Sequence, residues 1–255
     1  MNHSHTVAHL LFWSAWWFVI ATRTASGDEN ETAESKFGVV EGVITFAGDI
    51  PKSKVKDDAG QFRPLLTVDR RSRGLSFVVT YLLPVESQPP NANRSAEKNG
   101  EKQRKPVKVD QIEHRFVPHL IAIRESETVT FTNSDAANHN VRTIAFEDQN
   151  QFNIYTGAGG EYRHRFVAER KNRPVRLSCD IHPWMRGWVF VFRHSFYAVT
   201  DKNGRFRIAS IPPGDYRLRV EQPDIKYRHE RAVSVESATT KVEIEITEQD
   251  VHLAN

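Results

Sequence analysis

The chain's single cysteine lies in a short segment that also holds a histidine and a methionine. Cys179, His182 and Met185 follow one another at intervals of three residues, within Cys-Asp-Ile-His-Pro-Trp-Met. A thiolate, an imidazole and a thioether together favour copper over magnesium, calcium or manganese. Zinc is a weaker match, because zinc sites favour more Cys or His ligands and rarely use Met. The segment therefore predicts a mononuclear copper site.

A trigonal copper site needs a second imidazole from another part of the chain. His139 is the candidate, because it closely follows an expected strand at residues 128–132 and is succeeded by Asn140. Taken singly, a buried cysteine, a lone histidine and a core methionine all have ordinary structural explanations. Their spacing favours a shared role, since Cys179 is the only cysteine and Met185 is the only methionine after Met1.

Short apolar segments separated by turn residues surround these candidates, and no stretch shows a helical period. Several strands at such spacing predict a β-sandwich. Alternating apolar residues predict the strands, which lie near residues 121–123, 129–131, 175–177 and 188–192, and in a second group near 206–208, 216–220 and 242–246. We therefore expect an all-β protein, with one β-sandwich at residues 107–194 and a second, small β-sandwich at residues 195–255.

The region before the first sandwich contains two more expected strands, at residues 38–46 and 75–83, which could join either sandwich. Residues 87–106 carry alanines as their only apolar side chains, so we expect a polar linker there. Residues 28–106 are accordingly predicted to comprise N-terminal strands and this linker.

An apolar run of 12 residues spans positions 10–21 near the N-terminus. It is too short for a hydrocarbon core that requires about 20 residues, and it is typical of a secretory signal. Small residues at positions 24–27 suit a cleavage site. We expect residues 1–27 to be a signal peptide and the mature protein to be periplasmic or extracellular; an uncleaved membrane anchor is the alternative.

The composition excludes several classes of protein. Hydrophobic residues make up 39% and charged residues 26% of the 255 positions, which argues against an integral membrane protein and against wholesale disorder. The net charge of +3 is too small and too dispersed to indicate a nucleic-acid partner. One cysteine permits no intrachain disulfide.

Residues 107–192 resemble cupredoxins, most closely those of the amicyanin and plastocyanin type. The similarity rests on the block at 179–187 and on His139-Asn140-Val141. It implies a Greek-key β-sandwich with one type 1 (blue) copper, held by His139, Cys179 and His182 in the trigonal plane and by Met185 as a weak axial ligand. One departure is Ser126, which stands in a turn where the family usually has glycine.

The resemblance also implies roles for three neighbouring residues. The side chain of Asn140 would tie the two ligand loops together. Pro183 and Trp184 would lie beside an exposed edge of His182, where a redox protein partner could dock; for Trp184, packing within the loop is the alternative. Four other histidines, His114, His119, His164 and His194, show no recognisable partner set, and we expect His119 to be structural.

Residues 196–220 resemble the carboxypeptidase regulatory-like, or carbohydrate-binding-like, β-sandwich. The pattern D-x-x-G-x-F-x-I is followed there by P-P-G-x-Y-x-L. A cupredoxin paired with such a module resembles plastocyanin-like proteins loosely labelled methylamine utilisation proteins, a label that establishes no pathway. The module implies possible contact with a glycan or with the cell envelope.

These features favour an exported protein that carries single electrons through Cu(I)/Cu(II) and is not an enzyme. The predicted mature sequence lacks the His-x-His pairs that a multicopper oxidase would need. Two alternatives stay open: a copper carrier or store, for which more Met or His clusters would be expected, and an envelope or extracellular module that binds glycan or protein.

Overall fold

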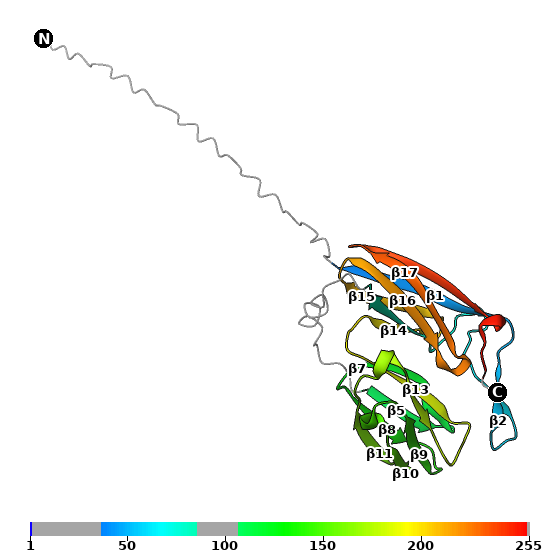
Figure 1. Ribbon diagram of the computed structural model, residues 1–255. Coiled ribbons are helices and arrows are strands. Elements are labelled where there is room, and N and C mark those ends of the chain that lie inside the picture. Colours follow the sequence, from blue (N-terminus) through cyan, green and yellow to red (C-terminus); the bar gives the residue numbers. More distant parts are fainter. Residues whose placement is uncertain (2–36, 86–106, 254–255) are drawn as a thin grey trace. The chain divides into compact units, whose positions relative to one another are not determined.

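The computed structural model describes residues 37–85 and 107–253, together with Met1 (Figure 1). The expected signal peptide and the polar segment at 87–106 lie outside the described residues. Within the described part, the chain forms 18 β-strands and four short 3-10 helices, so the all-β prediction is confirmed. No helix in these ranges has the length and apolar character required to cross a membrane.

Two sheets are built from the strands between residues 107 and 192. The five-stranded sheet has the order β10-β9-β12-β13-β7 and comprises β7 (Leu120–Arg124), β9 (His139–Ile144), β10 (Asn153–Thr156), β12 (Val175–Ser178) and β13 (Arg186–Phe192). The other sheet has the order β11-β8-β5-β6 and comprises β5 (Val107–Ile112), β6 (Arg115–Val117), β8 (Thr128–Asn133) and β11 (Glu161–Arg165).

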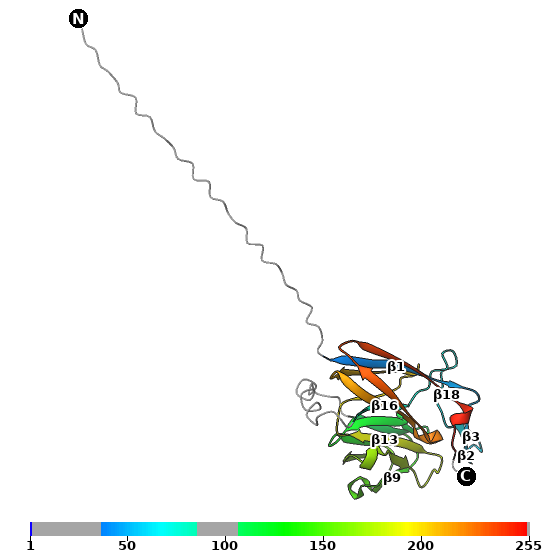
Figure 2. The ribbon, with the colours of Figure 1, turned by 45° about the horizontal axis from the view of Figure 1, so that its top comes forward.

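Two further sheets combine strands from both ends of the described chain (Figure 2). One has the order β14-β4-β16-β17 and comprises β4 (Val79–Pro84), β14 (Tyr197–Val199), β16 (Gly214–Gln222) and β17 (Tyr227–Val235). The other has the order β15-β1-β18 and comprises β1 (Gly38–Ala47), β15 (Arg205–Ile211) and β18 (Thr239–Thr247). The remaining elements are the hairpin of β2 (Lys52–Lys56) and β3 (Phe62–Pro64) and the 3-10 helices η1 (Asp148–Asn150), η2 (Arg170–Asn172), η3 (Pro223–Ile225) and η4 (Glu248–Asp250).

Strand pairing shows where the N-terminal strands belong. β1 is the middle strand between β15 and β18, and β4 lies between β14 and β16. Gly42 permits the close parallel approach of β1 to β18, because a Cβ there would lie 2.0 Å from the carbonyl oxygen of Val242. The second sandwich is therefore formed by segments on both sides of the 107–192 region, and not by residues 195–255 alone.

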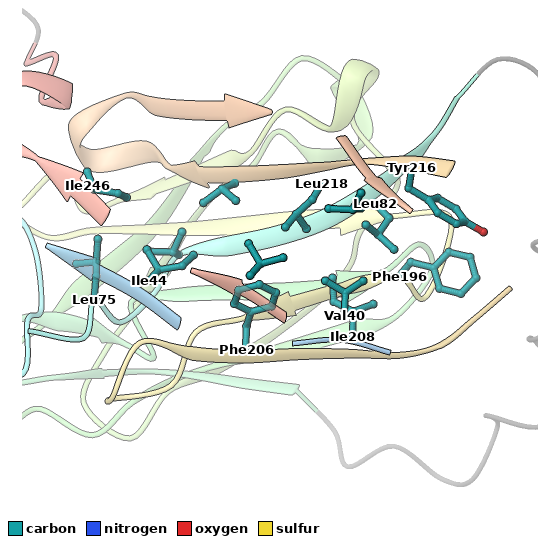
Figure 3. Close-up of a cluster of buried hydrophobic side chains, with 14 of the residues drawn as sticks. Val40, Ile44, Leu75, Leu82, Phe196, Phe206, Ile208, Tyr216, Leu218 and Ile246 are labelled. Atoms are coloured by element: carbon teal, nitrogen blue, oxygen red, sulfur yellow. The ribbon is translucent and has the colours of Figure 1, made fainter. Parts of the chain in front are cut away.

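Apolar side chains fill the spaces between these sheets. One core contains Val40, Ile44 and Phe206, from the β15-β1-β18 sheet, packed with Leu82 and Leu218 (Figure 3). A second core lies between the two sheets of the 107–192 region. It includes two of the candidate ligands, Cys179 and Met185.

Strand β13 is buried along most of its length, because its alternate side chains enter two different cores. Val189 and Val191 join the core of the 107–192 sandwich, whereas Phe190 and Phe192 pack with Tyr81 of β4. Cys179 and Met185 belong to the same core as Val189 and Val191. A continuous apolar run is typical of a strand covered on both faces.

The expected strand at 75–83 begins later, at Val79. Phe77 adopts a left-handed backbone conformation with φ of 60°, which interrupts the extended chain. His119, expected to be structural, places Nε2 2.6 Å from Oδ2 of the buried Asp224, whose other oxygen accepts a bond from Trp188 Nε1 at 3.1 Å. Asp224 therefore connects η3 to β13, which carries Trp188, and to His119, which directly precedes β7.

Candidate metal centre

Strand pairing brings the predicted ligands to one edge of the five-stranded sheet. His139 is the first residue of β9, and Cys179 directly follows the last residue of β12. Because β9 and β12 are antiparallel, the start of one lies near the end of the other. His182 lies in the loop from Cys179 to β13, where its carbonyl oxygen accepts a 2.9 Å bond from the N–H of Met185.

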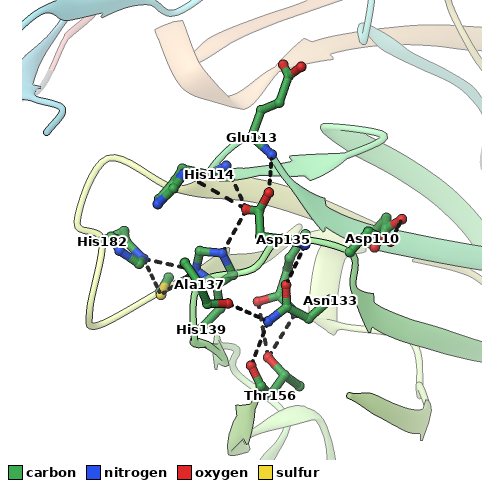
Figure 4. A network of polar contacts seen from close by, with 12 residues as sticks. Asp110, Glu113, His114, Asn133, Asp135, Ala137, His139, Thr156 and His182 are labelled. Carbon is green, nitrogen blue, oxygen red and sulfur yellow. Dashed lines mark hydrogen bonds and ion pairs between the residues drawn. The ribbon is translucent and has the colours of Figure 1, made fainter. Parts of the chain in front are cut away.

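Three candidate ligand atoms converge on one point (Figure 4). His139 Nδ1 lies 2.9 Å from His182 Nδ1, and Cys179 Sγ lies 3.9 Å and 3.7 Å from these two nitrogens, respectively. The point equidistant from these three atoms lies about 2.1 Å from each of them. This distance is close to metal–nitrogen and metal–sulfur bond lengths of about 2.0–2.3 Å. The three residues therefore fit a single metal ion in trigonal arrangement.

The candidate ligands differ in burial. His139 is fully buried and Cys179 is 2% exposed, whereas His182 is half-buried. Desolvation lowers the pKa of His182, and the nearby His139 and His114 lower it further. A lowered pKa favours the neutral imidazole, which is the form that binds metal.

Met185 is 1% exposed and lies in the same apolar core as Cys179. The structure thus places this thioether in the core beneath the loop that carries His182. Its role as the axial ligand remains a prediction.

Asn140 links the strand that carries His139 to the loop that begins at Cys179. Its Oδ1 accepts a 2.8 Å bond from the N–H of Asp180 and lies 3.2 Å from Cys179 Sγ. Its Nδ2 donates to Asn153 Oδ1 at 2.7 Å and to Asp180 Oδ2 at 3.1 Å. These bonds fix the loop to the strand without any metal.

Asp135 holds the second nitrogen of His139. Asp135 Oδ2 lies 2.9 Å from His139 Nε2, and the same carboxylate accepts bonds from the backbone N–H groups of Glu113 and His114 at 2.7 Å and 2.9 Å. Burial raises the pKa of Asp135, but the hydrogen bonds from His114, His139 and Glu113 outweigh it and leave the pKa below its usual value. A carboxylate in this position orients a ligating histidine and increases its basicity.

His114 is a site residue that sequence reasoning missed. It lies in the hairpin between β5 and β6 with φ of 54°, and its ring centroid is 4.6 Å from that of His182 and 5.3 Å from that of His139. One potential ligand atom from each of these histidines lies within 4.8 Å of the others. No spacing signal could reveal it, because only the parallel pairing of β5 with β8 brings this hairpin to Asp135.

The predicted docking residues differ in exposure. Pro183 is exposed, whereas Trp184 is half-buried and packs against the core of the 107–192 sandwich. The Trp184 ring lies 5.2 Å from that of His182, and the guanidinium of Arg63 lies over it. Ile181, which the sequence did not single out, is 51% exposed beside His182.

A cavity of about 350 Å³ adjoins the candidate ligands. His114, Trp184 and Met185 form part of its lining, together with Arg63 and His119. His114 therefore both lines this cavity and lies beside the imidazoles of His139 and His182.

The comparisons with known proteins yield partial structural similarity. No protein-family model matches the chain, and no curated protein sequence matches it. Among solved structures, the copper-containing nitrite reductase from Thermus scotoductus SA-01 is 27% identical with a TM-score of 0.31, over 35% of this chain and 23% of the reductase. An oxidised amicyanin variant is 21% identical with a TM-score of 0.30, over 36% of this chain and 88% of amicyanin.

A purple cupredoxin from Nitrosopumilus maritimus is also similar. It is 23% identical with a TM-score of 0.29, and the match covers 34% of this chain and 99% of that protein. All three similarities cover little more than a third of this chain, with TM-scores near 0.3.

Proposed function

We propose that this protein holds one type 1 copper ion and carries single electrons between redox protein partners outside the cytoplasm. The observation that supports the proposal is the triangle of Cys179 Sγ, His139 Nδ1 and His182 Nδ1, whose centre lies at bonding distance from all three atoms. A thiolate with two imidazoles and a weak methionine is the donor set of blue-copper electron-transfer sites. Copper would supply the Cu(I)/Cu(II) couple.

The surrounding residues favour fast electron transfer because they limit movement of the ligands. His139 begins a paired strand, and Asp135 holds its Nε2. Asn140 fixes the start of the loop through the N–H of Asp180. A donor set held in this way changes little between oxidation states, so little energy is needed for reorganisation.

Partner contact is proposed at the exposed edge of the ligand loop. Ile181 and Pro183 flank His182 in sequence and are both exposed. An apolar surface at a half-buried ligand permits close approach of a redox partner with little desolvation of charge. We assign no substrate turnover to the site.

His114 supports a second candidate function, that of a copper carrier. Its potential ligand atom lies within 4.8 Å of those of His139 and His182, so movement of this hairpin could add a third imidazole to the donor set. A ligand that binds in only one oxidation state would slow electron transfer and favour retention of the ion.

Copper titration of the purified metal-free protein tests the proposal. We expect one copper per chain, an intense thiolate-to-copper absorption band and the narrow copper hyperfine splitting of a type 1 site in electron paramagnetic resonance. Cys179→Ser should lose the band, whereas Ser178→Ala, one residue away, should keep it. Copper bound equally by wild type and Cys179→Ser, without a band, would overturn the proposal.

A further inference from the structure

A second cavity, of about 300 Å³, is lined by an excess of positive charge. Its cationic lining residues come from the β2 hairpin, β12, β13 and the end of η3, and they are Lys52, Lys54, Arg176, Arg186 and Lys226. Asp224 is the only acidic residue in the described lining. The described lining therefore holds more cationic than acidic side chains.

Asp224 offsets only part of this positive charge, and both of its oxygens already have hydrogen-bond partners. Its side chain is 2% exposed, and its two oxygens contact His119 Nε2 at 2.6 Å and Trp188 Nε1 at 3.1 Å. The Asp224 carboxylate therefore joins the side chains of His119 and Trp188.

Arg176 lies in an unfavourable electrostatic environment at this cavity. Its Nε is buried and has no hydrogen-bond partner among the described residues. Desolvation lowers the pKa of Arg176, and repulsion from Arg186 lowers it further, while Asp224 acts in the opposite direction. A buried donor without a partner costs stability, and so do two neighbouring guanidinium groups of like charge.

Arg186 is held in place at the same cavity. Its Nη2 donates a 3.3 Å bond to the buried Ser53 Oγ, which leaves other N–H groups of the guanidinium for a ligand. Lys52 and Lys226 are exposed and stand at the rim. Planar guanidinium groups bind oxyanions in a bidentate manner, and lysines add charge at longer range.

We propose that this cavity binds a small dianionic oxyanion of the phosphate or sulfate class, free or as part of a larger ligand. Such an anion would screen Arg176 from Arg186 and would offset the excess positive charge of the lining. A dianion matches the charge of two arginines better than a single carboxylate does. The volume exceeds that of the bare ion, so a substituted phosphate or sulfate also fits.

The cavity shares residues with the ligand loop, since Pro183 lines it and Arg186 directly follows Met185. A bound anion would place negative charge near the metal centre and would stabilise Cu(II) relative to Cu(I). The reduction potential should therefore fall when the anion binds. This consequence, unlike the anion site itself, rests on the proposed copper function.

Calorimetric titration of the metal-free protein with inorganic phosphate tests the site, with chloride at matched ionic strength as the reference. We expect saturable binding at one site per chain. Arg176→Gln should weaken the affinity at least tenfold, and Lys226→Gln, at the exposed rim, should weaken it two- to threefold. Arg163→Gln, an exposed arginine on β11 paired with Glu161, is the matched control and should leave it unchanged.

Unsaturable binding, or equal affinity in Arg176→Gln and Arg163→Gln, would overturn the anion site. Because the titration uses metal-free protein, its result does not depend on the copper proposal. If phosphate binds but no thiolate-to-copper band forms, the anion site stands and the copper function fails.

Discussion

Asp135 and His139 form a carboxylate–imidazole pair in which Asp135 Oδ2 lies 2.9 Å from Nε2, while Nδ1 of the same ring faces His182 Nδ1 at 2.9 Å. One nitrogen is thereby held by the protein, and the other is directed to the candidate metal position. The same carboxylate also fixes the hairpin that carries His114. Asp135 thus couples the orientation of a buried ligand to the position of a third imidazole.

Asp135→Asn should lower copper affinity by roughly 10- to 100-fold, because a neutral amide orients His139 less firmly and increases its basicity less. Competition with a copper chelator of known affinity measures the change. Asp110→Asn is the matched control, because that carboxylate binds Thr132 and Ser134 and contacts no candidate ligand. Equal losses of copper affinity in both variants would show that Asp135 acts only through its negative charge and not through its contact with His139.

His114→Phe separates the two candidate functions. If His114 only packs against His182, the variant should keep the absorption band and the electron self-exchange rate within about twofold. If His114 joins the donor set, the variant should shift the hyperfine splitting and release copper faster. Pulsed electron paramagnetic resonance, which counts coordinated imidazole nitrogens, provides the direct measurement.

Ile181→Glu should slow electron self-exchange between copies of the protein by tenfold or more, since it places a charge in the apolar surface beside His182. The absorption band should be unchanged, because Ile181 is 51% exposed. Phe146→Glu is the control: Phe146 is 58% exposed and follows the far end of β9 from His139, about 20 Å along an extended chain. Nuclear magnetic resonance line broadening in mixtures of both oxidation states measures the rate.

His194 should make the protein less stable as the pH falls. Burial, with a smaller contribution from Arg124, lowers the pKa of His194 from 6.5 to about 4. Between pH 6.5 and about pH 4, the unfolded chain binds a proton at this histidine that the folded protein does not. The free energy of unfolding therefore decreases as the pH falls, by up to roughly 3 kcal/mol.

The comparison of His194→Gln with wild type, by urea unfolding between pH 7 and pH 4, isolates this contribution. The variant should lose less stability over that window. His229→Gln, at an exposed position on β17, should follow the wild-type pH profile. An identical pH dependence in all three proteins would contradict the assignment to His194.

Ser126→Gly should stabilise the fold by roughly 0.5–1 kcal/mol, because Ser126 adopts φ of 71°, a conformation that glycine reaches without a Cβ clash. The N–H of Ser126 donates to the carbonyl oxygen of Phe166 at 2.8 Å and is retained in the variant. Thermal unfolding measures the gain. Ser126→Ala keeps the Cβ and should give no comparable increase.

Much of the fold class followed from the sequence, because alternation of apolar residues reports the faces of strands. The all-β architecture is of this kind, whereas the candidate ligand segment at 179–185 was indicated by residue types and spacing. Cys179, His182 and Met185 are close in the chain, so their spacing alone brings them within one loop.

Tertiary structure decided everything that depends on strand pairing between distant segments. The partnership of β1 with β18, and of β4 with β16, could not be read from patterns that fit either sandwich equally well. The same holds for His114, whose hairpin reaches Asp135 only through the pairing of β5 with β8. It also holds for Arg176, whose cationic neighbours come from the β2 hairpin, β13 and the end of η3. Local sequence encodes which residues face inward, whereas register between strands determines which of them meet.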